Sequence, residues 1–570
     1  MSVRLHGTER DAQLLRSRGP GIPELLRTNK VINRVNQNDL NEEFDLIVIG
    51  GGINGCGIAR DAAERGLRVL LIEKEDFGSA TSSTNTRLKH GGLRYLEFLE
   101  FNLVRESLKE RELLLKNANY LVKPLPVCIP IFKDDKRGYW TIKAGMLLYD
   151  LLSIGKSLPS HRMMSKNEFE IFEPSINSQN LVGAALYYDA QITYPERLCL
   201  ANALMAKNNK ATVINHAEVV FFTKQRDSIT GVEFVDRLTG KKLFARGKLI
   251  INSSGPWVDS ICGLASSDID RKIGGTKGSH IVIKQFDGGP KNAIYVSAKS
   301  DRRPFFIIPW QDYYLIGTTD IHFDGDLDKL KISNKEISYL INESNRVFKN
   351  KQISIEDIIF SYAGVRPLPF VGDKDPAGIT RRHLIFDHKK EGVSNFISII
   401  GGKLTTYRNL SEGVADLAFK KLGYKFIPTK TKRNPIPGNL NISETRFKET
   451  LSRSIEGIPF EVISHLVDLY GTNSIDVLKL LQKDPGGRKL LSPNGFDIFG
   501  QVDYAVTEEM AFTVSDVILR RLSLGLREGM GTDCVEAIGS KLKQSLGLTN
   551  EELSTQVDDY FSKVVNLRKV

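Results

Sequence analysis

The chain is poor in cysteine and has no long hydrophobic run. Its five cysteines, at positions 56, 128, 199, 262 and 534, are scattered and form no Cys-x-x-Cys pair. This spacing argues against a metal site and against a disulfide framework, and it fits a reducing compartment. No apolar run reaches the roughly 18 to 20 residues that a membrane-spanning helix needs. We therefore expect no bound metal and a protein that is soluble or bound peripherally to a membrane.

Blocks of basic residues are also missing, although the formal net charge is +11. Lysine and arginine are spread along the chain, and they form no cluster interleaved with aromatic residues of the kind that binds nucleic acid. The sequence predicts a solvated basic surface and no nucleic-acid partner. At 570 residues the chain is too long for one core and should form two or three domains.

Residues 1–43 are expected to form a separate N-terminal extension. They carry seven positive and six negative charges and no apolar core segment. This mixture is typical neither of a signal peptide nor of an acid-poor transit peptide. We expect the segment to be poorly ordered or docked on the surface.

The strongest motif lies just after this extension. The apolar run Asp45–Ile49 ends in Gly-x-Gly-x-x-Gly at residues 50–55, a helical pattern follows, and a second apolar run ends at Glu73 and Lys74. Such a βαβ unit binds a dinucleotide: Gly50 allows the tight turn, Gly52 the approach of a pyrophosphate, and Gly55 close packing of the helix. Glu73 is placed to accept hydrogen bonds from a ribose. The motif alone leaves NAD and FAD open.

The rest of the chain alternates between two kinds of pattern. Short apolar runs at 212–214, 248–252 and 396–400 are expected to return to the first sheet, and the last of them leads into a second glycine turn at Gly401 and Gly402. Alternating runs between 277 and 354 predict an antiparallel sheet. Beyond residue 429 the pattern is helical. A loop rich in hydroxyl side chains at 78–86 suits a cofactor longer than a nicotinamide dinucleotide.

Five motifs in order resemble those of the FAD-dependent glycerol-3-phosphate dehydrogenases. They are Gly50-Gly51-Gly52-Ile53-Asn54-Gly55, His90-Gly91-Gly92-Leu93-Arg94-Tyr95, Lys277-Gly278-Ser279-His280, Gly364-Val365-Arg366-Pro367, and Gly401-Gly402-Lys403-Leu404-Thr405-Thr406-Tyr407-Arg408. Several separate motifs in one order are far more specific than any single one. The resemblance covers about residues 44–408, and the helical tail is similar to that family's C-terminal cap domain.

The resemblance implies an α/β fold with three domains. A glutathione-reductase-type, Rossmann-like FAD-binding domain is expected from residues 44–125, 196–262 and 355–428. A mixed, mainly antiparallel β substrate domain is expected from 126–195 and 263–354, and a C-terminal helical domain from 429–570. The implied reaction is oxidation of sn-glycerol 3-phosphate to dihydroxyacetone phosphate, with electrons passing to a membrane quinone.

Site residues follow from the matching motifs. Arginine suits a phosphate because its guanidinium donates two parallel hydrogen bonds, so we expect Arg94 and Arg366 to bind the substrate phosphate, with help from Tyr95. Lys403 is expected to contact the substrate oxygen or to stabilise charge on the reduced flavin. The FAD contacts expected from the motifs and the hydroxyl loop are Gly50, Gly52, Ile53, Asn54, Gly55, Glu73, Lys74, Thr81, Ser82, Ser83, His90, Gly91, Gly92, Gly255, Gly402, Lys403, Leu404 and Thr405.

The proton acceptor is less well defined. We expect His280 to take the proton of the C2 hydroxyl, because an imidazole titrates near neutral pH. A structural role for His280 remains open, with Arg366 or Lys403 lowering the hydroxyl pKa while water accepts the proton. His90 is expected to pack beneath the flavin without a covalent bond to it.

The resemblance further implies a cytoplasmic protein held peripherally on the inner face of the cell membrane, and it leaves a homodimer open. Three alternatives remain. An oxidase of the same superfamily would pass electrons to oxygen, although the spacing of the motifs leaves little room for the insertion that such oxidases carry. A nicotinamide-dependent dehydrogenase conflicts with the hydroxyl loop and the second glycine turn. A scaffold flavoprotein without catalysis would need the basic cluster that the sequence lacks.

Overall fold

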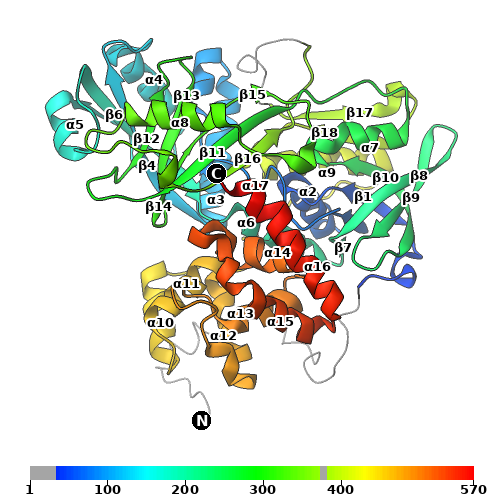
Figure 1. The fold of residues 1–570 in the computed structure, drawn as a ribbon. Helices are drawn as coiled ribbons and strands as arrows, with labels where there is room; N and C mark the ends of the chain where they lie inside the picture. Colours follow the sequence, from blue (N-terminus) through cyan, green and yellow to red (C-terminus); the bar gives the residue numbers. More distant parts are fainter. Residues whose placement is uncertain (1–33, 373–381) are drawn as a thin grey trace.

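The computed structural model describes residues 34–372 and 382–570. Two β-sheets lie side by side in the upper part of Figure 1, and a helical domain, coloured yellow to red, lies below them. The chain passes repeatedly between the two sheets before it enters the helical domain. This agrees with the α/β fold expected from the sequence.

The first sheet has the strand order β17-β18-β10-β1-β2-β7. Its centre is parallel, because β1 pairs with β10 on one side and β2 on the other, and β10 pairs with β18. The expected strands at 212–214, 248–252 and 396–400 all belong to it. The bounds are β1 Phe44–Ile49, β2 Val69–Ile72, β7 Thr212–Ile214, β10 Lys242–Asn252, β17 Leu384–Asp387 and β18 Phe396–Ile400, with β8 Ala217–Gln225 and β9 Ser228–Asp236 forming a hairpin that pairs with β10.

Three helices form the core beside this sheet. Helix α2 (Ile53–Glu64) is buried almost throughout and packs against α6 (Pro195–Asn208) and α9 (Tyr407–Leu422). The apolar runs of β1 and β2 are buried on both faces, as expected for parallel strands covered by helices. Burial of these runs fixes the turn after β1 in position.

The second sheet is mixed and has the order β15-β11-β14-β13-β12-β4-β6-β3. Its antiparallel part confirms the pattern expected between 277 and 354. Strand β16, which lies in the segment 355–428 that we expected in the FAD domain, pairs instead with β11 in this sheet. The bounds are β3 Leu88–Lys89, β4 Val122–Phe132, β5 Arg162–Ser165, β6 Leu181–Ile192, β11 Thr276–Lys284, β12 Ala293–Ser297, β13 Pro304–Trp310, β14 Tyr313–Gly317, β15 Ile321–His322 and β16 Ile358–Arg366.

Further helices surround the sheets. They are the 3-10 helix η3 (Leu93–Phe98), α3 (Phe101–Asn117), α4 (Tyr139–Leu152), α5 (Lys166–Phe172), α7 (Val258–Ala265) and α8 (Asn334–Asn345). The C-terminal domain is helical, as the sequence predicts. It contains α10 (Glu444–Ser454), α11 (Phe460–Tyr470), α12 (Ser474–Lys483), α13 (Phe499–Thr507), α14 (Val514–Asp516), the π-helical turn Val517–Arg521, α15 (Val535–Leu546), α16 (Asn550–Tyr560) and α17 (Asn566–Arg568).

The expected N-terminal extension is described from residue 34 onward. Arg34 Nε donates to Asp236 at 2.5 Å, and Gln37 Nε2 donates to the carbonyl of Phe244 at 2.9 Å. Residues 34–43 are therefore docked on the first sheet. The expectation for residues 1–33 lies outside the described residues.

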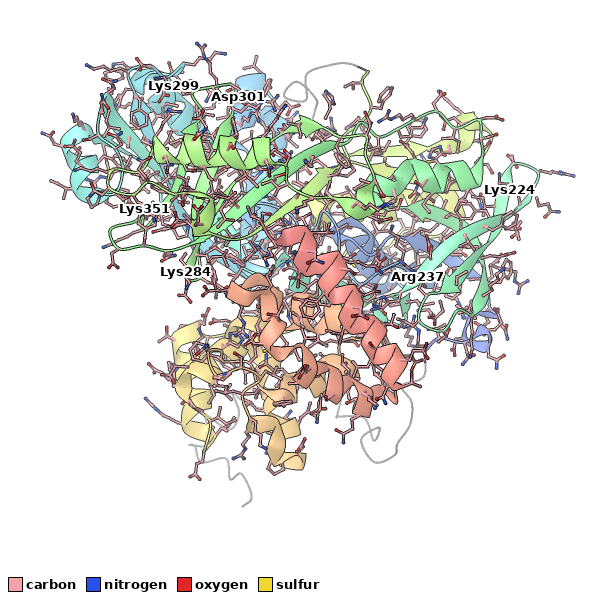
Figure 2. The ribbon with its side chains drawn as sticks, in the orientation of Figure 1. Lys224, Arg237, Lys284, Lys299, Asp301 and Lys351 are labelled. Carbon is pink, nitrogen blue, oxygen red and sulfur yellow. The ribbon has the colours of Figure 1, made fainter. Side chains whose placement is uncertain are left out.

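Charged side chains project from widely separated parts of the surface. Figure 2 labels Lys224 on the β8–β9 hairpin, Lys284 at the end of β11, and Lys299 and Lys351 toward the left edge of the molecule. Lys284 pairs with Glu528 at 2.6 Å and Lys351 with Asp357 at 2.8 Å. This distribution agrees with the scattered basic residues of the sequence.

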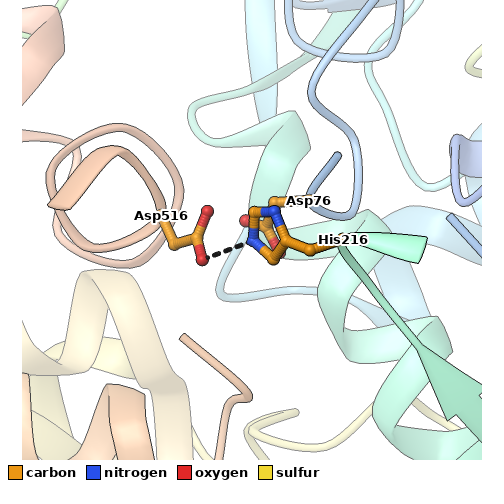
Figure 3. A group of neighbouring side chains, drawn as sticks. All are labelled: Asp76, His216 and Asp516. Atoms are coloured by element: carbon orange, nitrogen blue, oxygen red, sulfur yellow. Dashed lines mark hydrogen bonds and ion pairs between the residues drawn. The ribbon is translucent and has the colours of Figure 1, made fainter. Parts of the chain in front are cut away.

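A buried ionic network joins the FAD domain to the helical domain. His216, in the turn before β8, contacts Asp516 of α14 at 2.8 Å, and Asp76 lies beside them (Figure 3). The Asp76 carboxylate accepts from Arg520 at 2.5 Å and from Arg521 at 2.7 and 3.0 Å, and Arg520 also donates to Asp516 at 2.8 Å. Two guanidinium groups thus neutralise the two carboxylates, so these side chains form an ion-pair network across the domain boundary.

This network should make stability depend on pH. Burial lowers the pKa of His216, but the Asp516 carboxylate more than offsets this effect and raises the pKa above its ordinary value. A folded-state pKa above about 6.5 gives stabilisation that is complete below about pH 6.5 and is lost as the pH rises through the folded value. We expect His216→Gln to lower the unfolding free energy by about 2 kcal/mol at pH 6, and by less at pH 9. Thermal unfolding at both values tests this.

Candidate active site

A large cavity lies between the two sheets. Its volume is about 2630 Å³, and its walls come from the turns after β1 and β18, the loop 79–86, η3, β16 and part of the helical domain. Most of the residues expected at the site line this one cavity. The exceptions, which do not line it, are Gly55, Ser83, Gly91, Gly92 and His280.

The first glycine turn has the backbone that a bound pyrophosphate requires. Gly50 has a φ of +105°, and a Cβ placed there would lie 2.5 Å from the carbonyl oxygen of Ser253. A Cβ at Gly55 would lie 1.8 Å from the carbonyl oxygen of Gly50, so Gly55 permits close packing of helix and strand, as expected. Both positions exclude any larger residue, and they direct the N-terminus of α2 toward the cavity.

Glu73 and Lys74 end β2 at the cavity wall. Glu73 accepts the backbone N–H of Gly51 at 2.5 Å and that of Glu75 at 2.8 Å. Burial raises the pKa of Glu73, and these two hydrogen bonds oppose the rise. The carboxylate therefore holds the glycine turn in place at the cavity wall. The Lys74 ammonium lies 3.9 Å from the centre of the Trp257 ring.

The hydroxyl loop closes over the start of α2. Ser82 Oγ accepts the N–H of Ile53 at 2.9 Å, and Thr81 Oγ1 donates to the carbonyl of Val365 at 2.7 Å. Ser83 turns away from the cavity and donates to Ala80 at 3.0 Å. Thr81 thus connects the FAD domain to β16 of the second sheet.

Two side-chain oxygens of described residues at the cavity have no hydrogen-bond partner. Asn54 Oδ1 and Ser253 Oγ are buried and have no hydrogen-bond partner in the described structure. Unsatisfied buried oxygens are rare in folded proteins. They lie next to the two glycine turns, since Asn54 Nδ2 donates to the carbonyl of Gly401 at 3.2 Å and Ser253 contacts Gly50. This arrangement fits a dinucleotide held between the turns.

The His90-Gly91-Gly92 loop is fixed by a buried carboxylate. Asp189 Oδ1 accepts from the N–H of Gly91 at 3.0 Å, from Arg111 at 2.7 Å and from Tyr149 at 2.9 Å. A Cβ at Gly91 would lie 2.1 Å from the Tyr149 hydroxyl, which explains the glycine. Burial, followed by the charge of Lys403, lowers the pKa of His90 to about 4. His90 is therefore a neutral ring at the cavity wall.

Arg366 reaches the cavity from the end of β16. Its guanidinium donates to Asp320 Oδ1 at 2.9 Å and to Thr318 Oγ1 at 3.2 Å. Asp320 also accepts, through its backbone carbonyl, a hydrogen bond from Arg303. The side chain of Arg366 is 28% exposed, so an anion in the cavity can reach it while Asp320 holds its orientation.

The other expected substrate residues lie on the same cavity. Arg94 and Tyr95 belong to η3, and Lys403 follows the second glycine turn. The Lys403 ammonium lies 3.7 Å from the centre of the Tyr95 ring, in cation–π contact, and donates to Ser107 at 3.4 Å. Three cationic side chains from distant parts of the chain therefore converge on one cavity, which suits a phosphorylated substrate.

His280 does not lie at the cavity surface, where a direct contact with the substrate hydroxyl would require it. It is buried behind the cavity wall, stacks on Tyr362 with ring centres 4.9 Å apart, and contacts Thr86 Oγ1 at 3.0 Å. Burial, followed by the charges of Arg366 and Arg87, lowers its pKa to about 3. Thr86 lines the cavity, so the Thr86 hydroxyl connects His280 to the cavity.

Sequence reasoning missed several cavity residues. They are Thr86, Arg303, Thr318, Asp320 and Tyr362. Asp320 and Thr318 follow the apolar run of β14 directly, and polar residues at a strand end were the available signal. Nothing in the sequence indicated that Asp320 would meet Arg366.

Sequence comparisons identify the family. The profile of the FAD dependent oxidoreductases matches residues 45–408, and that of the C-terminal domain of alpha-glycerophosphate oxidase matches residues 429–553. A glycerol-3-phosphate dehydrogenase of Synechocystis sp. is 45% identical over 537 residues, covering 91% of this chain and 96% of its own. The chain belongs to the FAD-dependent glycerol-3-phosphate dehydrogenase family. FAD is the cofactor of this family, and the glycine turns and unpartnered oxygens fit it.

Further relatives agree with this assignment. The aerobic glycerol-3-phosphate dehydrogenase of Staphylococcus haemolyticus is 34% identical over 497 residues, covering 85% of this chain and 88% of its own. The solved glycerol-3-phosphate dehydrogenase from Bacillus halodurans, complexed with FAD, superposes with a TM-score of 0.77 at 27% identity, covering 92% of this chain and 95% of its own. The α-glycerophosphate oxidase of Mycoplasma pneumoniae shares the fold, with a TM-score of 0.52 at 19% identity and coverage of 68% and 97%.

Proposed function

We propose that this member of the glycerol-3-phosphate dehydrogenase family oxidises sn-glycerol 3-phosphate to dihydroxyacetone phosphate and delivers the electrons to a membrane quinone. The observation that carries the proposal is the convergence of Arg94, Arg366 and Lys403 on the cavity that the two glycine turns border. When bound, FAD supplies the hydride acceptor at flavin N5.

The arginines hold the substrate in this proposal. A phosphate dianion between Arg94 and Arg366 places the charged end of the substrate away from its reacting carbon. Binding energy from this remote group can then be used to position C2 and its hydroxyl. Asp320 keeps the Arg366 fork in one orientation, so little rotamer freedom is lost on binding.

The proton of the C2 hydroxyl passes to His280 through Thr86. In the described structure, Arg366 is one of the charges that lower the His280 pKa. A phosphate dianion bound to Arg366 offsets this charge, which raises the basicity of His280 when substrate is present. Lys403, beside Tyr95, stabilises the negative charge that develops on the hydroxyl oxygen.

Thr86→Val tests this proton route. We expect kcat to fall by about 10²-fold with KM nearly unchanged, because a positioned general base contributes about 10²- to 10⁴-fold. The matched control is Thr84→Val, which removes a cavity hydroxyl that bonds Ala80 instead of His280. A loss in kcat below about tenfold for Thr86→Val would mean that water takes the proton directly.

The reaction itself is tested with purified protein kept free of oxygen. The yellow flavin absorbance should bleach on addition of sn-glycerol 3-phosphate and should persist on addition of glycerol. Absence of bleaching would refute the proposed substrate. Reoxidation by a quinone analogue is expected to be faster than reoxidation by air, and the opposite order would indicate an oxidase.

A further inference from the structure

The outward face of helix α4 carries a row of large apolar side chains. Trp140, Leu147 and Leu151 are 75%, 56% and 62% exposed, and Ile154, just beyond the helix, is 81% exposed. Their spacing of 7, 4 and 3 residues places them along one side of the helix. The opposite side holds Met146 and Tyr149, which are buried in the core of the substrate domain.

The α4 surface continues onto η3. Glu97 of η3 pairs with Arg137, which lies just before α4. Phe98 and Leu99, the next two residues, are 50% and 71% exposed. We call the six side chains Phe98, Leu99, Trp140, Leu147, Leu151 and Ile154 the α4 patch. An exposed apolar area of this kind usually marks an interaction site.

Charges at the α4 patch favour a lipid surface over another protein face. Lys143 lies 5.1 Å from the centre of the Trp140 ring, and Lys136 is exposed three residues before the helix. Asp150, the acidic residue of α4, lies off the exposed side and is paired with Lys156 and His161. Tryptophan beside lysine, next to an uncharged leucine row, is typical of helices that lie in the membrane interface.

Among the described residues, no helix is long and apolar enough to cross a bilayer. A lipid-soluble electron acceptor must nevertheless be reached if the proposed function is correct. Helix η3 connects the cavity with the α4 patch. Arg94 and Tyr95 line the cavity, and Phe98 lies three residues beyond Tyr95 at the surface.

We propose that the α4 patch docks this protein on an anionic phospholipid bilayer, with the helix lying in the plane of the interface. Helix α4 lies at the upper left of Figure 1, away from the helical domain at the bottom. Docking there places η3 at the lipid surface and gives a quinone a short path to the cavity. This last consequence rests on the proposed function, whereas docking itself does not.

Flotation with lipid vesicles tests the docking surface. The full chain with FAD bound is mixed with vesicles of phosphatidylcholine and phosphatidylglycerol, and the fraction that floats is measured. We expect L147D/L151D to lower the vesicle partition coefficient at least tenfold, since each change places a charge in the apolar layer. L147I/L151I should float like the original protein. Phe221→Asp, which changes a 54% exposed side chain on β8 at the far right of Figure 1, should also leave flotation unchanged.

Two outcomes would overturn this inference. They are failure of the original protein to float and equal flotation of L147D/L151D. If equal flotation is accompanied by a change of oligomeric state in that variant, measured by light scattering, a second copy of the chain covers the α4 patch. Flotation needs neither substrate nor turnover, so a normal result together with no oxidation of glycerol 3-phosphate would count against the proposed function alone.

A kinetic measurement separates docking from catalysis. L147D/L151D should keep its rate with a water-soluble electron acceptor and lose at least tenfold of its rate with a long-chain quinone embedded in vesicles. Equal losses with both acceptors would show that the substitutions damage the active site, and would contradict a docking role.

Discussion

Arg366→Ala is expected to lower kcat/KM for sn-glycerol 3-phosphate by about 10²- to 10³-fold, mainly through KM. Losing one member of a desolvated charge pair costs about 2–5 kcal/mol, and each 1.36 kcal/mol is tenfold in rate. The loss should be large because Asp320, whose side chain is 11% exposed, then keeps its negative charge near the phosphate without the positive charge of Arg366 to offset it. Steady-state kinetics measures the effect.

The control for this variant is Arg271→Ala. Arg271 is an exposed arginine that pairs with Asp324 and lies off the cavity. Arg271→Ala should leave kcat/KM for sn-glycerol 3-phosphate unchanged. The flavin absorbance of Arg366→Ala should match that of the original protein. Loss of FAD from that variant would instead place Arg366 at the cofactor, against the proposed role.

Gly50→Ala is expected to lower the amount of FAD retained after purification at least tenfold. A non-glycine residue in this region of φ costs about 1–3 kcal/mol. The new Cβ would also lie 2.5 Å from the carbonyl oxygen of Ser253, a cavity residue whose buried hydroxyl has no hydrogen-bond partner among the described residues. The backbone around residue 50 must therefore shift in this variant, at the position where the pyrophosphate is expected to bind. The ratio of flavin to protein absorbance gives the result.

Gly66→Ala separates the effect of backbone strain at positive φ from the effect of a steric clash of the new Cβ. Gly66 has a φ of +93°, and a Cβ there would meet nothing within 4 Å. This variant should lose some stability through strain and keep its FAD. If both variants retained FAD equally, the close approach at Gly50 would have no part in cofactor binding.

The sequence predicted those parts of the site that depend on short stretches of chain. The turn at Gly50, the acid at Glu73 and the second turn at Gly402 are local, because a strand, a turn and a helix start lie within a few residues. Their positions on one cavity agree with the expectation. The pairing of Arg366 with Asp320 depends instead on the register between β11 and its neighbours β14 and β16, which no local pattern encodes.

His280 illustrates the same limit. It lies on β11, in the antiparallel sheet that the sequence predicts, but its side chain does not line the cavity and contacts the cavity residue Thr86 instead. The alternation of side chains along a strand predicts which residues share a face of the sheet. It does not predict which of the two faces binds a ligand. Strand β16 was expected with the FAD domain for a related reason, since an apolar run does not reveal the sheet that it joins.

The order of strands in the first sheet has a consequence for folding. Phe44 of β1 lies beside Gly247 of β10, and Ile250 of β10 lies beside Phe396 of β18. Closing such long loops costs conformational entropy before any pairing compensates it. The sheet therefore cannot be completed until residue 400 has left the ribosome. We expect that no fragment ending before β18 folds independently, and that newly made chains need a chaperone or slow synthesis to avoid aggregation.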